Sequence, residues 1–234
     1  MPDKIKKTYN RLYQTNSDLV FTDLEVVDEN LNTIYPSFND YMFLSRKINK
    51  CKDSYLMQSL YNCITGCTLM SKKIFLDKII PIPTDSKYVI HDTWIGLIVS
   101  LYGKVEYLDE QTIKYRQHGD NQVGTNHLSH KFQKVEDVRN LFLNVKVQLF
   151  TSYVNNENVF PEELRIQNKK ALEYFQMLEN KKYFNFRKWN IFIKLYKNER
   201  FLYMIENFAI LNLPLLSRIP FGIRHFILKL KGER

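Results

Sequence analysis

The hydrophobic pattern of the chain changes near residue 125, and this change limits the possible folds more than any other feature of the sequence. Before it, short apolar runs such as DLVFT (18–22) alternate with helical stretches, which predicts an α/β layer architecture with a mixed sheet. After it, apolar residues recur at three- and four-residue spacing, which predicts helices only. We therefore expect an α/β region over residues 1–125 and an all-helical region over 126–234.

Within the first region the pattern predicts alternating elements. We expect a basic helix over 3–15, a buried strand at 18–22, a helix over 55–62, a strand-like run after Cys63, a helix over 92–102 ended by Gly103, and two short strands, KVEYL and TIKYR.

The second region predicts three helices. The first is long, with an apolar stripe formed by Phe132, Val135, Val138, Leu141, Phe142, Val145 and Leu149. The second covers 161–179 and the third 187–204.

Charge is distributed unevenly between the two regions. Residues 1–124 carry 15 Lys and Arg against 15 Asp and Glu, and the rest of the chain carries 19 against 10. In the third helix an apolar stripe (Trp189, Phe192, Ile193 and Tyr196) is flanked by basic residues: Arg187, Lys188, Lys194, Lys197 and Arg200. Two interpretations stay open: an ordinary packed helix with a solvated basic face, or a helix lying on an anionic membrane surface.

Composition excludes several other classes of protein. No apolar stretch reaches the ~20 residues that a membrane span needs, and the charged opening MPDKIKKTYN is no signal peptide. Three cysteines without such a signal indicate a reducing cytoplasm, and Cys63 and Cys67 lack the further ligands of a zinc site. The basic excess carries no nucleic-acid-binding motif, so we expect no nucleic-acid partner.

The stretch YVIHDTWIG (88–96) places a histidine and an aspartate inside an apolar run. An ionised carboxylate is costly to bury unless it is hydrogen-bonded, paired or metal-bound. Asp92 is therefore expected either to cap the helix that follows it or to be a site residue at the mouth of a cleft. The two roles are compatible, because a helix N-terminus favours an ionised carboxylate.

Three segments occur in an ordered series: LVFTDLEVVDEN, NCITGCTLMSKKIF, and IHDTWIG through GKVEYLDEQTIKYRQHGDNQVG. In this order they resemble the second half of a family-2 glycosyltransferase of the GT-A fold, closest to the rhamnosyltransferase-like enzymes of bacterial surface polysaccharide synthesis. The resemblance covers residues 1 to about 125. It implies a partial GT-A, Rossmann-like mixed sheet, an inverting transfer from a nucleotide-diphosphate sugar, and a lipid-linked or other glycan acceptor.

The resemblance also implies roles for residues of the helix at 92–102. Asp92 matches the family's general base, which removes the proton of the acceptor hydroxyl. His91 stands where the family usually has an acidic residue, and Trp94 follows in the same segment, so we expect both to contact donor or acceptor.

Further site residues are implied elsewhere. Gly66, with Thr65 before it, matches the glycine beside donor sugar and acceptor, where a ligand approaches the backbone closely. Arg116 and His118 of YRQHG match a segment over the diphosphate, so Arg116 would pair with phosphate and His118 would touch metal or phosphate; the alternative is a surface arginine and a loop histidine. Asp23 matches a structural position near the sheet edge.

The family's Asp-x-Asp motif, which supplies the main carboxylate ligands of a Mg or Mn ion, has no counterpart in this sequence. By the resemblance, the chain would lack the N-terminal nucleotide-binding half and be weak or inactive alone, with a separate N-terminal half as a possible partner. We expect residues 1–125 to be the acceptor-side portion and 126–234 a basic helical tail. That tail would dock the protein on the cytoplasmic face of the plasma membrane. The alternative is a non-catalytic fragment or subunit that acts as an interaction protein.

Overall fold

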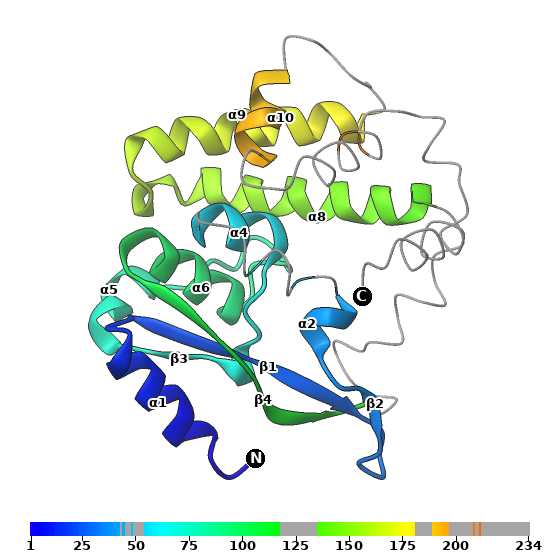
Figure 1. Cartoon of the computed structure of the whole chain (residues 1–234). Helices are drawn as coiled ribbons and strands as arrows, with labels where there is room; N and C mark the ends of the chain where they lie inside the picture. Colours follow the sequence, from blue (N-terminus) through cyan, green and yellow to red (C-terminus); the bar gives the residue numbers. More distant parts are fainter. Residues whose placement is uncertain are drawn as a thin grey trace. The chain divides into compact units, whose positions relative to one another are not determined.

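The computed structural model divides the chain into two compact units, Met1–Gly124 (unit 1) and Thr125–Arg234 (unit 2). It describes residues 1–42, 44, 48, 54–117, 135–180, 189–196, 208 and 211. Unit 1 combines a mixed β-sheet with helices, and the described elements of unit 2 are helical (Figure 1). The mixed α/β class expected from the sequence is confirmed, and the division into units falls beside the change in sequence pattern.

Unit 1 contains these elements in chain order: α1 (Lys4–Gln14), β1 (Leu19–Val27), β2 (Thr33–Tyr35), α2 (Phe38–Tyr41), α4 (Ser54–Tyr61), a 3₁₀ turn (Gly66–Thr68), β3 (Met70–Ser71), a second 3₁₀ turn (Lys73–Phe75), α5 (Leu76–Ile79), α6 (His91–Tyr102) and β4 (Val105–Arg116). The helices expected over 3–15, 55–62 and 92–102 are confirmed, with ends that differ by one residue at most.

Strand β1 lies at the centre of the sheet. It pairs in parallel with β4 from Leu19 beside Val105 to Val27 beside Arg116. On its other edge it pairs antiparallel with β3 near its start and with β2 near its end. All residues of β1 except Glu25 are buried, as is typical of a strand covered on both faces.

Asp23 is the one charged residue of β1 that is fully buried, with 2% of its surface exposed. Its Oδ1 accepts hydrogen bonds from the backbone N–H groups of Leu24 (2.8 Å) and Asn39 (3.0 Å). Its Oδ2 accepts from the hydroxyl of Ser37 (2.6 Å) and the amide of Gln111 (3.0 Å). Four donors compensate the burial of this carboxylate, so Asp23 has a structural role. The family resemblance implied such a role but near the sheet edge, whereas β1 is the central strand.

Strand β4 corrects one prediction. The sequence predicted two short strands separated by polar residues, but the structure has one strand of 12 residues. Its pairing with β1 shifts register on either side of Asp23, and Gln111 of the expected gap holds the Asp23 carboxylate. Pairing with β1 therefore keeps the strand continuous across residues that the apolar pattern excludes.

Helix α6 supplies much of the core of unit 1. Trp94, Leu97, Ile98 and Val99 are at most 1% exposed. The helix ends at Gly103 as predicted. A larger residue does not fit there without a shift, because a Cβ on Gly103 would lie 2.7 Å from the Phe75 ring and 2.8 Å from the Asp18 carboxylate.

Unit 2 contains, within the described residues, α8 (Val135–Asn155), a 3₁₀ turn (Glu157–Val159), α9 (Glu162–Glu179) and α10 (Trp189–Tyr196). The helix predicted over 161–179 is confirmed as α9. Of the helix predicted over 187–204, the structure describes the part in α10; Arg187, Lys188, Lys197 and Arg200 lie outside the described residues.

The buried face of α8 differs from the predicted stripe. Side chains that are at most 4% exposed recur along it at three- and four-residue spacing: Arg139, Leu143, Lys146, Phe150 and Tyr153. Of the predicted stripe, Leu149 is buried but Leu141 is 38% exposed. Phe132 and the side chains of Val135 and Val138 lie outside the described residues. Two of the buried side chains, Arg139 and Lys146, are cationic. A prediction from hydropathy does not assign cationic side chains to the buried face of a helix.

Arg139 is one of these buried cations, and it stabilises a helix end. Its guanidinium donates to the carbonyl of Leu178 (3.0 Å), in the last turn of α9, and to that of Leu211 (3.1 and 3.2 Å). A cation there satisfies a carbonyl that lacks an intrahelical partner and complements the negative end of the helix dipole.

The apolar face of α10 is directed toward the interior of unit 2. Phe192 and Tyr196 are each 1% exposed and Leu195 is 3% exposed. The helix packs against α9, and the Phe192 ring lies 6.5 Å from that of Tyr174. The packed-helix interpretation therefore holds for α10, and Phe192 and Tyr196 are not available to a membrane surface. No helix within the described ranges is long and apolar enough to cross a bilayer.

Candidate functional site

Gly66 and Asp92, which belong to two of the three segments that the sequence analysis linked to chemistry, meet in unit 1. The backbone N–H of Gly66 donates a hydrogen bond to Oδ2 of Asp92 at 2.9 Å, although the two residues lie 26 positions apart. Gly66 begins the 3₁₀ turn before β3, and Asp92 lies in the first turn of α6. Of the predicted donor- and acceptor-binding residues, the structure thus brings Gly66 directly to Asp92.

Asp92 is not the N-cap that the sequence suggested. Helix α6 begins at His91, and Ile90 occupies the N-cap position without a side-chain hydrogen bond. Asp92 Oδ1 instead accepts from the backbone N–H of Thr93 at 2.7 Å. One oxygen thus satisfies a free N–H of the first turn, and the other holds the Gly66 turn.

The Asp92 carboxylate is also more buried than expected of a base at an open cleft. Its residue is 7% exposed, and both oxygens accept backbone N–H bonds. Those bonds and the positive end of the α6 dipole compensate the burial. That a cleft opens over Asp92 stays a prediction.

The His91 imidazole lies close to Gly66. A Cβ on Gly66 would lie 2.4 Å from Nε2 of His91 and 3.4 Å from Cβ of Asp92. Such a contact requires the imidazole to move. The close approach that we predicted at Gly66 therefore exists, but within the described residues it is made by His91.

Lys4 is a member of this cluster that sequence reasoning missed. From α1, its ammonium donates to the carbonyl of Cys67, 63 positions away. The turn at Gly66–Thr68 is thus held on one side by Asp92 and on the other by Lys4. The sequence shows Lys4 as one of several lysines in a basic helix, so no local signal distinguishes it.

Cys67 itself is at the surface and has no disulfide partner. Partial burial raises the pKa of its thiol; the nearby negative charge of Asp92 adds to this, and the charge of Lys4 opposes it. The thiol is therefore protonated near neutral pH, which disfavours a nucleophilic or metal-binding role.

Trp94 and Thr65, also predicted to contact donor or acceptor, have clear structural roles. Trp94 is 1% exposed and its indole N–H donates to the carbonyl of Ile79 at 2.9 Å. A ligand cannot reach the ring in this conformation, because it belongs to the core. Thr65 is half-buried, and its carbonyl accepts from the backbone and hydroxyl of Thr68 at 2.8 and 2.7 Å.

Arg116 lies at the far end of the sheet from the start of β1. It is exposed, ends β4 and pairs with Val27. Its convergence with Asp92 over a diphosphate stays a prediction. His118 lies outside the described residues.

The described residues do not fit a divalent cation. The part of the chain that the structure describes holds no group of three or more His, Cys, Asp or Glu side chains able to bind a metal ion.

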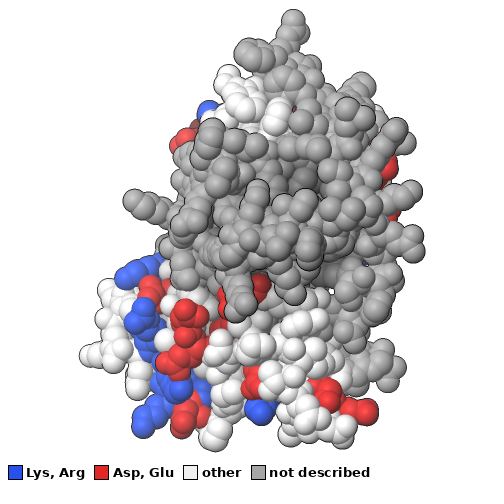
Figure 2. All heavy atoms as spheres, turned by 45° about the vertical axis from the view of Figure 1, so that its right-hand side comes forward, with Lys and Arg blue, Asp and Glu red and all other residues white. Residues whose placement is uncertain are grey.

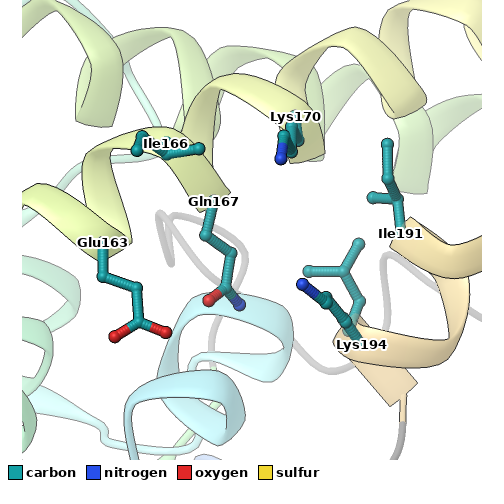
Figure 3. Close-up of a pocket in the computed structure, with 7 residues that line it drawn as sticks. Glu163, Ile166, Gln167, Lys170, Ile191 and Lys194 are labelled. Atoms are coloured by element: carbon teal, nitrogen blue, oxygen red, sulfur yellow. The ribbon is translucent and has the colours of Figure 1, made fainter.

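A separate hollow of about 120 Å³ lies in unit 2 between α9 and α10. Lys194 extends from α10 toward Gln167 of α9 (Figure 3). The lining mixes aliphatic, cationic and acidic side chains: Glu163, Ile166, Gln167, Lys170, Ile191, Lys194 and Leu195. It contains none of the residues that the sequence predicted for a site.

Comparison with known proteins adds no assignment: no family model, no curated protein and no solved structure matches the chain.

Proposed function

We propose that this chain acts in glycosyl transfer, as the acceptor-side part of an inverting glycosyltransferase that uses a nucleotide-diphosphate sugar. The observation that carries the proposal is the hydrogen bond between Gly66 and Asp92, with His91 packed on the glycine. The family resemblance names these residues from two separate segments, and a donor site and a base must adjoin the same anomeric carbon.

In the proposed reaction Asp92 is the general base. The acceptor hydroxyl donates a hydrogen bond to the carboxylate, and its oxygen attacks the anomeric carbon. The hydroxyl proton passes to Asp92 as the new C–O bond forms. The bond from the anomeric carbon to the diphosphate breaks, and its electron pair leaves with the diphosphate. A carboxylate offers about four lone-pair positions, so two backbone donors leave capacity for the acceptor.

No step of the proposal uses a divalent ion, because the described residues do not fit one. Lys4, the cation that the structure brings to the Gly66 turn, is engaged by the Cys67 carbonyl. We therefore propose that donor binding depends on a separate polypeptide half, and that the chain alone turns over slowly.

Docking on the cytoplasmic face of an anionic membrane stays part of the proposal, because the net charge of +9 lies in residues 125–234. It must use side chains other than Phe192 and Tyr196, since both are buried. Flotation with anionic and neutral vesicles tests it: replacing Lys188, Lys194 and Lys197 by Glu should abolish recovery with anionic vesicles.

A second candidate function is a non-catalytic interaction protein. The burial of Asp92 favours it, since a carboxylate held by two backbone donors is also a structural clamp for the Gly66 turn.

The deciding experiment combines calorimetric titration with nucleoside diphosphates, with and without manganese, and a nucleotide-sugar hydrolysis assay. Asp92→Asn should abolish turnover. It also leaves one backbone N–H without its acceptor, at a cost of about 1–3 kcal/mol. Ser37→Ala is the matched control, because it removes a buried hydrogen bond to Asp23 and a helix cap elsewhere in unit 1.

Turnover lost in Asp92→Asn but kept in Ser37→Ala, at equal loss of stability, supports the base. Equal turnover in both variants contradicts it. A wild-type chain that neither binds nor hydrolyses any donor, even with the other half added, supports the interaction protein. Micromolar, metal-dependent donor binding by the chain alone would show that it needs no separate half.

A further inference from the structure

Helix α1 turns its polar face toward the sheet. Thr8 is fully buried, and its hydroxyl bonds to backbone carbonyls of the same helix. Lys7 pairs with Glu110 at 2.6 Å, and Arg11 pairs with Glu106, both on β4. The helix is thus attached to unit 1 largely through charged side chains.

The apolar side chains of α1, in contrast to its polar face, are exposed to solvent. Ile5, Tyr9 and Tyr13 recur at four-residue spacing along α1 and so lie on one face of the helix. Met1, which precedes the helix, continues the same spacing, and we call these four side chains the α1 ridge. Their exposed fractions are 51%, 65%, 59% and 78%. A continuous apolar ridge directed at solvent is typical of an interaction surface.

The charges around the helix do not favour a membrane as the occupant. Lys7 and Arg11 are engaged with acidic residues of β4, and residues 1–124 have equal numbers of basic and acidic side chains. On the face of unit 1 shown in Figure 2, basic and acidic groups lie interleaved. An interfacial helix instead presents a strongly basic polar face around its apolar stripe.

We propose that the α1 ridge is the contact through which two copies of this chain associate. Ridges formed at four-residue spacing interdigitate with one another at a crossing angle of about −50°. A two-fold axis at Tyr9 sets the aliphatic end of one ridge, at Ile5, against the aromatic end of the other, at Tyr13. The ridge is thereby complementary to itself, as a two-fold interface requires.

The area of the ridge sets the strength of this contact. Two tyrosines and two aliphatic side chains, each more than half exposed, offer roughly 400–500 Å² per copy. A pair therefore buries at most about 1,000 Å², the area that separates weak from stable interfaces. The dimer is accordingly reversible and dependent on concentration.

Sedimentation velocity of the full chain, from low to high micromolar concentration, tests the proposal. The wild type should shift from monomer toward dimer, and Tyr9→Lys/Tyr13→Lys should remain a monomer throughout. Ile74→Lys is the matched control, because Ile74 is 70% exposed in unit 1 but lies outside the ridge; it should dimerise like the wild type. All three positions are exposed, so equal circular dichroism melting of the variants is expected.

A geometric test uses a single cysteine at the expected axis. In a Cys51→Ser/Cys67→Ser background, Tyr9→Cys should form disulfide-linked dimers faster than Gln14→Cys. A wild type that is monomeric at every concentration overturns the proposal, as do a dimer that persists in the double lysine variant and equal cross-linking at both cysteines. A monomer that floats with lipid vesicles through the ridge assigns it to a membrane instead.

Discussion

Helices α1 and α10 are both short and amphipathic, but they present opposite faces to the units to which they belong. In α10 the aromatic side chains of Phe192 and Tyr196 are each 1% exposed. In α1 the corresponding apolar residues are directed at solvent, with Tyr13 78% exposed, and Thr8 is buried instead.

The neighbours of each helix explain the difference. Helix α10 packs against α9, whose buried Ala171 and Tyr174 offer an apolar surface. Helix α1 lies against β1 and β4, where Glu106 and Glu110 offer partners for cations. An amphipathic sequence predicts a helix with two faces, and the neighbouring element decides which of them is buried.

The largest expected effect tests burial directly. Phe192→Ala should lower the free energy of unfolding by about 3–5 kcal/mol, because it leaves a cavity in unit 2. Tyr9→Ala, the same kind of truncation on α1, should change it by less than about 0.5 kcal/mol in a dilute monomeric sample. Urea unfolding measures both, and similar losses in the two variants would remove the contrast between the helices.

A smaller effect is expected from the hydroxyl of Tyr196. It is buried without a hydrogen-bond partner among the described residues, and burial raises the pKa of Tyr196 well above its ordinary value of 10. The neutral form is therefore favoured in the folded state, so stability is lost as the pH rises above 10, where the unfolded chain ionises. Tyr196→Phe should remove this loss and add up to about 1 kcal/mol at neutral pH.

Thermal unfolding of the wild type and Tyr196→Phe at pH 7 and above pH 10 measures this effect. Tyr9→Phe is the control, because an exposed tyrosine should leave the pH dependence unchanged. If Tyr196→Phe loses as much stability above pH 10 as the wild type does, the Tyr196 hydroxyl is solvated in the folded state.

The attachment of α1 should depend on salt, unlike that of α10. Arg11→Met removes the pair with Glu106 and should cost up to about 1 kcal/mol at low ionic strength. In ~1 M salt the Debye length falls to about 3 Å, so the wild type and Arg11→Met should converge. Hydrogen exchange of α1 and α10 amides in both conditions checks this, and exchange of α10 that responds to salt as much as α1 would contradict it.

The smallest effect concerns the candidate site. Lys4→Met removes the clamp on the Cys67 carbonyl and should speed amide exchange in Gly66–Thr68 without changing the melting temperature measurably. Lys6→Met, at an exposed neighbouring position, should have neither effect. Unchanged exchange in both variants would mean that Asp92 alone holds the turn.

Part of the candidate site was predictable from the sequence, because Asp92 and Gly66 stand out locally. A carboxylate in an apolar run needs partners, and a glycine in ITGCT indicates a close approach. What approached the glycine was not predictable, since the contact with His91 joins segments 25 positions apart. Trp94 was assigned to the site although its ring is in the core, since sequence distance to Asp92 says nothing about the direction of a side chain.

Local sequence patterns were sufficient for the α/β class of unit 1, for α8 and α9 of unit 2 and for the end of α6 at Gly103, because these depend on residues that are neighbours along the chain. Only the tertiary structure decided that β4 is one strand, that the buried face of α8 carries Arg139 and Lys146, and that α1 is attached by its polar side. Each of these depends on a partner distant in sequence: β1 for β4, the carbonyls of Leu178 and Leu211 for Arg139, and Glu106 for Arg11. A local pattern records which residues are apolar, but long-range partners determine the free energy of burying each face.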